Sequence, residues 1–183
     1  MKEVRLTRAF FERDSPVVAP ELLNKVLVVG ECAGRIVEVE AYRSDDPASH
    51  TFRGRTARNA TMWGPGGHLY VYFTYGMHFC ANVVTSVGGD GQAVLLRAAV
   101  PLRGLETMRS RRGGRPDRIL ADGPAKLCQA FGLDRGDDGT DLVNGSRIAI
   151  TDDGTAPPAR PLVTPRIGIR VATDVPWRWL VPE

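Results

Sequence analysis

The sequence predicts an α+β fold, and three patterns support this prediction. Apolar and polar residues alternate with the period of a β-strand at 35–42 and again through 68–84. Apolar residues recur with helical spacing at 102–109 and 124–131. Short β-type runs separated by proline-rich turns fill the C-terminal end. Because no repeat or linker divides the chain, we expect one domain over residues 1–183.

The composition is that of an ordinary globular protein, with 43% hydrophobic and 25% charged residues and a net charge of +3. Three of the 24 basic residues are lysines, at Lys2, Lys25 and Lys126, and the others are arginines. Arginine binds phosphates in a forked geometry and stacks on rings, which suits a polyanionic partner. A GC-rich genome explains the same bias equally well.

The three cysteines, Cys32, Cys80 and Cys128, lie far apart and form no C-x-x-C pair. Neither a disulfide framework nor a zinc cluster is predicted, and a reducing compartment is expected. The N-terminus is too charged for a secretory leader, and no apolar run approaches membrane length. We therefore expect no membrane partner and a soluble protein that is located inside the cell and is not secreted.

The first elements are predicted to be a short helix pair within residues 6–29. Pro16 and Pro20 suit the first turn of a helix, and Leu22, Leu23 and Val26 follow at helical spacing.

Residues Arg35–Tyr42 are predicted to form a strand with two distinct faces. A partly desolvated carboxylate at Glu40, beside the ring of Tyr42, would suit a general base. A solvent-exposed strand face would explain the same carboxylates without any chemistry, and the pattern alone favours that reading. The first face carries Ile36, Glu38, Glu40 and Tyr42, and the other carries Val37, Val39 and Ala41.

A long polar loop follows over 43–67, and long loops in compact domains are typically functional or mobile. A metal site is a second interpretation of the acidic residues here, although their spacing matches no ligand signature. Its candidate ligands are Glu38, Glu40, Asp45, Asp46 and His50.

Residues His68–Val84 are predicted to form two strands around a turn at Tyr75-Gly76. Tyr70 and Tyr72 share one face of the first strand, where both could simply be packed. Tyr75 precedes the turn glycine and is expected to point outward, where an exposed ring can unstack a base step.

Arg97 interrupts the apolar strand predicted at 91–102, and a charge there requires a carboxylate or an anion. Glu40 is the expected partner. A helix containing Leu102, Leu105 and Met108 is predicted next, and another begins at Pro124 and stops at Gly132.

The ordered set "GRIVEVEAY", "ASH", "RNATMWGPGGHLYVYFTYGMHFCANVV", "AVLLRAAVPLRGLETM", "DGPAKLCQAFGL" and "PRIGI" resembles the 3-methyladenine (alkyladenine) DNA glycosylase family. The resemblance covers roughly residues 7–180. It implies a curved, mainly antiparallel sheet with flanking helices and a protruding β-hairpin. It also implies a monofunctional base-excision enzyme that flips alkylated or deaminated purines out of duplex DNA. Such an enzyme hydrolyses the N-glycosidic bond, leaves an abasic site, and acts as a monomer without a metal or organic cofactor.

The resemblance also assigns roles to individual residues. Glu40 matches the general base that activates water, with Arg97 and the main-chain carbonyl of Ile167 helping to hold that water. Tyr42, His50 and Tyr72 match the pocket that sandwiches the base, and Tyr70 lies on the same strand face as Tyr72. Tyr75 matches the intercalating residue, and Asn82 matches an asparagine that disfavours the amino group of guanine. Thr56, Arg58 and Met62 align with a region that contacts DNA beside the lesion.

Two other function classes fit parts of the same pattern. A non-catalytic nucleic-acid binding module would use the tyrosines and arginines for stacking and phosphate contacts. A metal-dependent hydrolase would use Glu40, Asp45, Asp46 and His50.

Overall fold

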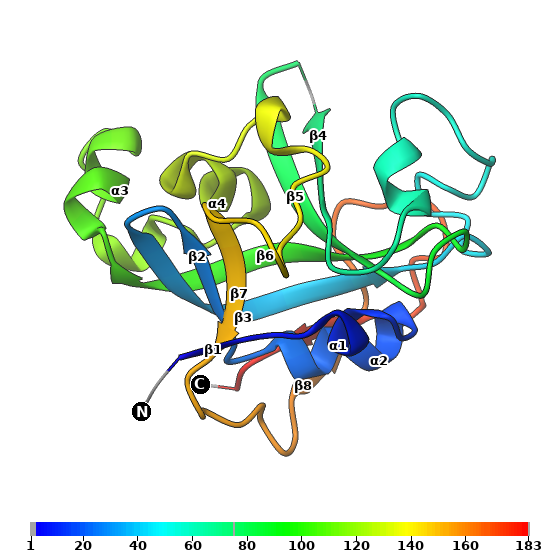
Figure 1. Ribbon diagram of the computed structural model, residues 1–183, viewed down its shortest axis with the longest axis horizontal. Helices are drawn as coiled ribbons and strands as arrows, with labels where there is room; N and C mark the ends of the chain where they lie inside the picture. Colours follow the sequence, from blue (N-terminus) through cyan, green and yellow to red (C-terminus); the bar gives the residue numbers. More distant parts are fainter. Residues whose placement is uncertain (1–2, 75, 183) are drawn as a thin grey trace.

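The computed structural model describes residues 3–74 and 76–182, and within them nine strands form one curved antiparallel sheet (Figure 1). Its strand order is β1-β7-β2-β3-β6-β5-β4, and β9 pairs with both β3 and β8. The predicted α+β class is confirmed. The strands are β1 (Val4–Arg5), β2 (Val26–Val29), β3 (Cys32–Tyr42), β4 (Leu69–Thr74), β5 (His78–Thr85), β6 (Gln92–Arg103), β7 (Ile148–Asp152), β8 (Leu162–Thr164) and β9 (Arg178–Leu180).

Short helices flank the sheet, as the sequence predicts. The helix α4 ends where Gly132 adopts a left-handed conformation with φ 68°, which glycine reaches without steric cost. The α-helices are α1 (Arg8–Phe11), α2 (Ser15–Leu22), α3 (Leu105–Arg111) and α4 (Pro124–Phe131), and the 3₁₀ turns are η1 (Ala60–Trp63), η2 (Asp117–Ile119) and η3 (Arg135–Asp137).

Two boundaries predicted from helical spacing are wrong. Val26 lies in β2, where it pairs with Arg35 of β3, because the apolar run Val26–Val29 is short enough to be a buried strand. Leu102 lies in β6, and the helix that follows starts at Leu105 after Gly104, whose φ is 72°. Short apolar runs fit both periods, so the neighbouring strands decide between them.

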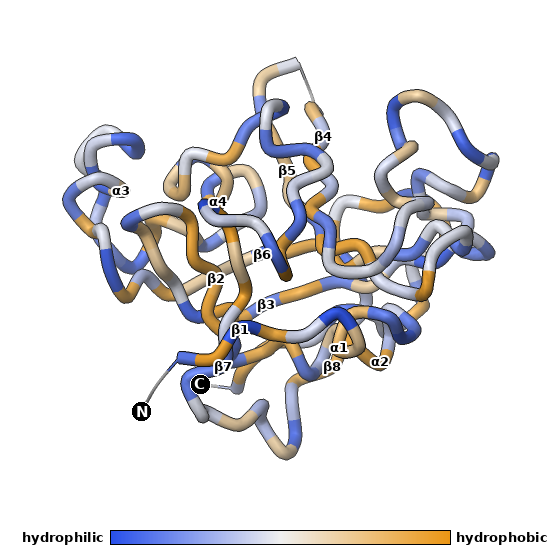
Figure 2. Tube along the Cα trace, viewed as in Figure 1, coloured by the Kyte–Doolittle hydropathy of each residue, from blue (hydrophilic) through white to orange (hydrophobic). Residues whose placement is uncertain are grey.

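The apolar faces of the central strands pack against α2 and α4, and apolar residues follow these strands in Figure 2. Val39, Ala41 and Leu96 have no exposed surface and belong to this core. Leu127 and Phe131 complete it from α4. One face of the sheet is therefore fixed by packing, which leaves the other face of β3, β6, β5 and β4 available for polar groups.

A β-bulge changes the predicted faces of β3. The register shifts between Ile36 and Glu38, which leaves Val37 without a direct partner on β6. Ile36 therefore lies in the core with Val39 and Ala41, and not on the face of Glu38 and Glu40 as the alternation predicted. The extra residue keeps Ile36 buried while the two glutamates leave the core face.

The predicted tyrosine hairpin is present as β4 and β5, which pair from Leu69 with Val83 to Thr74 with His78. Tyr75, predicted to intercalate, lies outside the described residues. The protrusion of this hairpin stays a prediction.

The three cysteines are free and buried. No helix in residues 3–74 and 76–182 combines the length and apolar character needed to cross a membrane.

Candidate active site

Four side chains form a row across the centre of the sheet. Glu40 of β3 is paired with Leu95 of β6, Leu95 with Asn82 of β5, and Asn82 with Tyr70 of β4. Directly paired residues point to the same face of a sheet, so the four share one surface. At about 4.8 Å between strands, the row spans roughly 14 Å.

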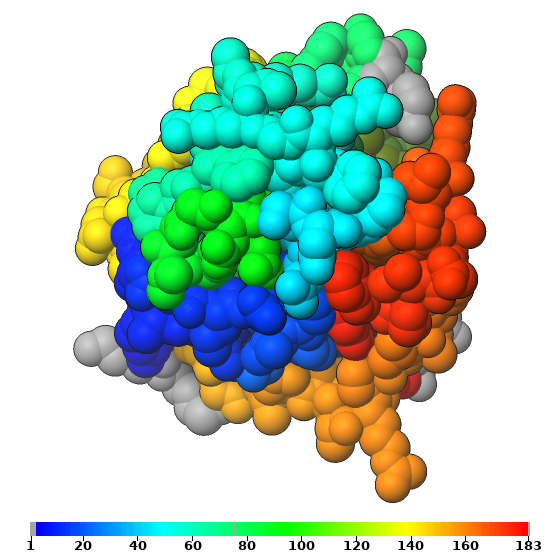
Figure 3. All heavy atoms as spheres, turned by 90° about the vertical axis from the view of Figure 1, so that its right-hand side faces the viewer, coloured from blue at the N-terminus to red at the C-terminus, as the bar shows by residue number. Residues whose placement is uncertain are grey.

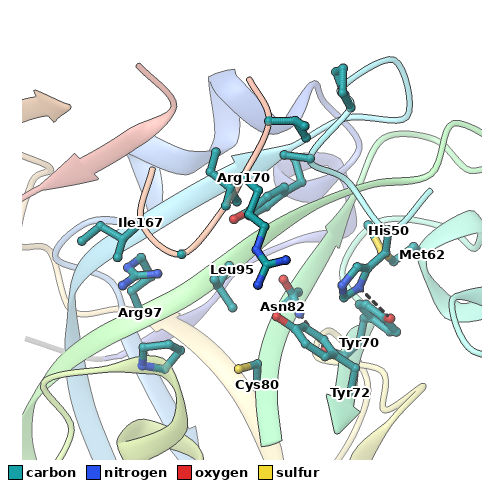
Figure 4. A pocket seen from close by; sticks show the side chains of 17 residues that line it. His50, Met62, Tyr70, Tyr72, Cys80, Asn82, Leu95, Arg97, Ile167 and Arg170 are labelled. Carbon is teal, nitrogen blue, oxygen red and sulfur yellow. Dashed lines mark hydrogen bonds between the residues drawn. The ribbon is translucent and has the colours of Figure 1, made fainter. Parts of the chain in front are cut away.

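A cavity of about 430 Å³ lies over this row, and Leu95, Asn82 and Tyr70 line it (Figure 4). Its volume falls in the range of small-molecule sites. In Figure 4, Tyr70 and Tyr72 stand on one side of the cavity, and Arg97 and Ile167 stand on the other. The acidic end of the row and the aromatic end therefore flank the same space.

Glu40 has no exposed surface, and three donors hold its carboxylate. The Tyr42 hydroxyl donates to Oε2 at 2.8 Å, and the Ile167 amide N–H donates to Oε1 at 2.8 Å. Arg97 Nη1 lies 3.2 Å from Oε1. Glu40 thus does not decorate a solvent-exposed strand, and its three partners, all of which line the cavity, separate it from that space.

The predicted partnership of Arg97 with Glu40 is present, and Arg97 has a second carboxylate partner. Its Nε donates to Glu38 Oε1 at 2.7 Å, and Arg178 Nε donates to the same oxygen at 2.6 Å. Burial acts to lower the pKa of Arg97, but the charges of Glu40 and Glu38 raise it overall. A charged Arg97 is therefore compatible with its place inside an apolar strand.

Aromatic rings form the opposite wall of the cavity. The rings of Tyr70 and Tyr72 stack with centroids 5.6 Å apart, and the His50 ring meets Tyr72 edge-on at 4.5 Å. His50 Nδ1 lies 3.2 Å from the Tyr70 hydroxyl. Three rings from β4 and the loop after β3 thus offer apolar surface with polar edges, which suits a flat heterocycle.

The ionisable groups of this wall are neutral near pH 7. Desolvation, followed by the charge of Arg58, lowers the pKa of His50. Burial raises the pKa of Tyr70 to about 12, and burial together with the hydrogen bond to Cys80 raises the pKa of Tyr72. A neutral imidazole keeps one donor and one acceptor, so His50 can bond Tyr70 and still present its other ring nitrogen.

The loop that carries His50 is held by the buried side chain of Asn59. Its Nδ2 donates to the His50 carbonyl at 2.8 Å and to the Gly54 carbonyl at 3.0 Å, and its Oδ1 accepts from the Thr56 amide. The side chains of Thr56 and Arg58 are exposed and lie outside the cavity lining. Met62, by contrast, is buried and lines the cavity.

The sequence interpretation did not single out several residues of the site. Leu95 and Cys80 line the cavity floor, and strand alternation around Arg97 and Asn82 could have indicated both. Arg170 is exposed and extends into the cavity in Figure 4, and its charge directly after "PRIGI" was the available signal. The buried Arg166 carried no such signal, because its partners lie far away in sequence.

The candidate ligands of the alternative metal interpretation do not converge. Both oxygens of Asp46 are bonded to Arg166, and Asp45 Oδ1 pairs with Arg43 Nε at 3.1 Å. Among the described residues, no group of three or more His, Cys, Asp or Glu side chains is arranged to hold a metal ion. These two carboxylates form ion pairs with arginines, so the geometry does not support the metal-hydrolase interpretation.

The site combines a buried carboxylate with a cavity whose rings suit a flat heterocycle. Comparison with known proteins identifies the family. The family model described as methylpurine-DNA glycosylase matches residues 9–183. The chain belongs to this family. The predicted resemblance is confirmed, and with it the class of enzyme, a DNA glycosylase that hydrolyses N-glycosidic bonds.

Individual relatives agree over almost the whole chain. A Burkholderia lata protein, provisionally named 3-methyladenine DNA glycosylase, is 59% identical over 181 residues, which is 97% of this chain and 87% of the relative. A Carboxydothermus hydrogenoformans protein of the same name is 46% identical, over 95% of this chain and 93% of its own. A Rhodopseudomonas palustris protein, also so named, is 48% identical over 95% and 83%.

Proposed function

We propose that this methylpurine-DNA glycosylase binds duplex DNA as a monomer and draws a damaged purine nucleotide out of the helix into the cavity. There it would hydrolyse the N-glycosidic bond and leave an abasic site. The observation that carries the proposal is the buried Glu40 carboxylate, held by three donors at one end of a row whose other end is an aromatic wall. All of these groups come from one chain, and we propose that residues 1–183 act as one glycosylase domain.

In the proposed reaction, Glu40 accepts a proton from a water molecule whose oxygen bonds to C1′ of the sugar. The bond between C1′ and the base breaks, and its electron pair leaves with the base. A carboxylate has about four acceptor positions, and three are occupied here, which leaves about one for water. Because Glu40 is fully buried, that water must enter through the wall formed by Tyr42, Arg97 and Ile167.

A single carboxylate is sufficient because the leaving group needs little help. An alkylated, cationic purine departs as a neutral base, so the enzyme requires a positioned nucleophile and an anion near the developing oxocarbenium charge. This distinguishes the site from the paired acid and base of ordinary glycosidases. Arg97 Nη1 and the backbone at Ile167 flank the carboxylate and are proposed to hold the water with it.

Tyr42, His50 and Tyr72 are proposed to sandwich the extruded base. Base–aromatic stacking contributes about 1–3 kcal/mol per contact, and a cationic base gains further attraction to the ring faces. If the Tyr70 hydroxyl donates to His50 Nδ1, the Nε2–H is left to donate to the base. This N–H can donate to an acceptor atom of hypoxanthine as well as to one of an alkylated purine. We therefore include deaminated purines among the proposed substrates.

Selection against normal bases is assigned to the floor of the cavity and to the cost of extrusion. Asn82 is buried, and its Nδ2 donates to the Tyr70 carbonyl at 3.2 Å, which fixes the amide beneath the base. A fixed amide there would clash with the exocyclic amino group of guanine and so disfavour the binding of that base. Tyr75 is proposed to fill the vacated position in the duplex. Extrusion costs a few kcal/mol and is least costly at a damaged or mispaired base.

A nicking assay tests this function. Duplexes that each contain one 3-methyladenine, 7-methylguanine, hypoxanthine or etheno-adenine are incubated with the protein in EDTA and then cleaved with alkali. We expect strand breaks only after alkali, together with release of the free base. A protein that binds these duplexes but releases no base would be a binding module, and activity lost in EDTA would indicate a metal enzyme.

A further inference from the structure

Arg166 is a buried arginine between two aromatic rings, outside the cavity lining. Its Cζ lies 4.7 Å from the Tyr42 ring centroid and 5.5 Å from that of Trp177. Its Nη1 and Nη2 bond the two oxygens of Asp46, the latter at 3.0 Å, and Nη1 also donates to the Ala41 carbonyl at 3.0 Å. The side chains of Arg166 and Asp46 are 0% and 3% exposed.

Net stability is a weak explanation for this arrangement. Desolvation of both charges offsets most of the attraction in a buried ion pair, and apolar residues of similar volume often stabilise as well. The Arg166 Nε is buried without a hydrogen-bond partner in the described part of the chain. The guanidinium thus occupies this position although one of its donors is unsatisfied. A buried unsatisfied donor calls for an explanation, and the contacts that the guanidinium makes with its neighbours provide one.

The contacts of Arg166 join three parts of the site that are distant in sequence. Asp46 lies in the loop that carries His50, and in the space-filling view this loop and the C-terminal segment lie side by side (Figure 3). Tyr42 packs against the guanidinium and donates to Glu40 Oε2. The residue after Arg166 is Ile167, whose amide N–H donates to Glu40 Oε1.

We infer that Arg166, together with Asp46, is a positioning residue: it holds the Tyr42 hydroxyl and the Ile167 amide against the two oxygens of Glu40, and fixes the His50 loop beside them. This inference rests on the proposed role of Glu40. Arg166 touches neither the cavity nor the reacting atoms, and it acts only through these neighbours.

The consequence for chemistry follows from the donors on Glu40. Each O–H or N–H donor stabilises an ionised carboxylate relative to the protonated form. The charged and titratable groups around Glu40 are Tyr42 on β3, Arg97 on β6 with its partner Glu38, Arg178 on β9, Cys80 on β5 and, behind Tyr42, Arg166. If Tyr42 and Ile167 drift from Glu40, the carboxylate loses two of its three donors, and its oxygens are no longer held in one position toward a water molecule.

Arg166→Lys keeps the charge but loses the planar fork and the stacking, and Asp46→Asn removes the other half of the pair. Arg35 provides a matched control on the same strand as Glu40. It bonds both oxygens of Asp153, at 2.7 and 3.4 Å, and donates to the Asn24 carbonyl at 2.8 Å, away from the cavity. Arg35→Lys and Asp153→Asn therefore remove the same chemistry from a remote site.

The experiment measures single-turnover base release from a 7-methylguanine duplex near neutral pH, and binding to a duplex with an abasic-site analogue. We expect Arg166→Lys and Asp46→Asn to slow release about tenfold or more near neutral pH. Analogue binding should stay within about threefold, and both control variants should keep the parental rate within about twofold.

Parental release rates in both variants would overturn the inference, as would a loss of analogue binding as large as the loss of rate. Failure of both variants to fold while the controls fold would also overturn it, because Arg166 would then contribute to stability alone. If only one variant folds, that variant decides. The proposed function is tested separately, by wild-type base release and its loss in Glu40→Gln. An active wild type with an inactive Glu40→Gln and a normal Arg166→Lys would refute the positioning role and leave the function intact.

Discussion

Replacing Glu40 with glutamine removes one charge and almost no volume, so it isolates the proposed base. The side-chain oxygen can stay opposite Arg97 and the Ile167 amide, which both donate. The new amide NH₂ then faces the Tyr42 hydroxyl, which can turn from donor to acceptor. Arg97 keeps Glu38 as a partner. We therefore expect Glu40→Gln to fold, at a cost of about 1–2 kcal/mol in the free energy of unfolding.

The expected loss of rate is far larger than the loss of stability. A positioned general base typically contributes about 10²–10⁴-fold. The anion at position 40 also stabilises positive charge on the sugar, so we expect a fall of at least the middle of that range, about 10³-fold or about 4 kcal/mol of barrier. Duplex binding should be nearly unchanged, because the buried Glu40 offers no surface to DNA.

Single-turnover release of 7-methylguanine, with enzyme in excess, measures this barrier directly. Glu38→Gln is the control, since Glu38 pairs with the same Arg97 but receives none of the donors from Tyr42 or Ile167. Its effect should stay below about tenfold. If Glu40→Gln retained a rate within about tenfold of the parent, a carboxylate-driven water could not be the chemistry of this site.

Three further predictions test other parts of the site. Asn82→Ser should remove the fixed amide from the cavity floor and yield measurable release of normal guanine, scored by alkali nicking of undamaged duplex; no release would contradict the assigned role. Arg170→Ala should weaken duplex binding and reduce the slope of log Kd against log salt by about one, since a phosphate contact releases about one counterion. The control is the separate variant Arg160→Ala, at an exposed arginine, which should change neither the binding nor the slope. Because the pKa of His50 is lowered in the folded protein, the unfolded chain binds more protons below the ordinary value of 6.5, so the contribution of His50 to stability is present above pH 6.5 and is lost as pH falls toward the folded-state pKa. In thermal melts, the melting temperature of His50→Gln should therefore fall less over that pH interval than that of the parent. An identical fall in both proteins would contradict the assignment.

Much of this site could be predicted because its central contacts follow strand logic. A charge in the apolar strand β6 requires a carboxylate, and Glu40 on the neighbouring strand meets Arg97 as expected. The tyrosine pair on β4 follows from alternation alone. The resemblance then joined these local signals into one activity.

The parts that could not be predicted depend on long-range or irregular geometry. Alternation along β3 placed Ile36 beside the glutamates, since nothing in the pattern marks the bulge at Val37. The Ile167 carbonyl was assigned as a water ligand, whereas the contact present is the amide N–H on Glu40, and the role of the carbonyl stays a prediction. The pairing of Asp46 with Arg166 joins two loops 120 residues apart, and loop composition carries no record of such a contact.

The irregularity in β3 also sets a limit on how this protein can vary. A strand sends alternate side chains to opposite surfaces, so removing Val37, which has no direct partner on β6, would rotate either the half of β3 that carries Glu40 or the half that carries Ile36. In the first case the carboxylate would be driven into the hydrocarbon interior, and in the second Ile36 would be pushed into water. Substitutions at Val37 should therefore be tolerated, whereas its deletion would turn buried and exposed side chains of β3 to the opposite faces of the sheet, next to Glu40.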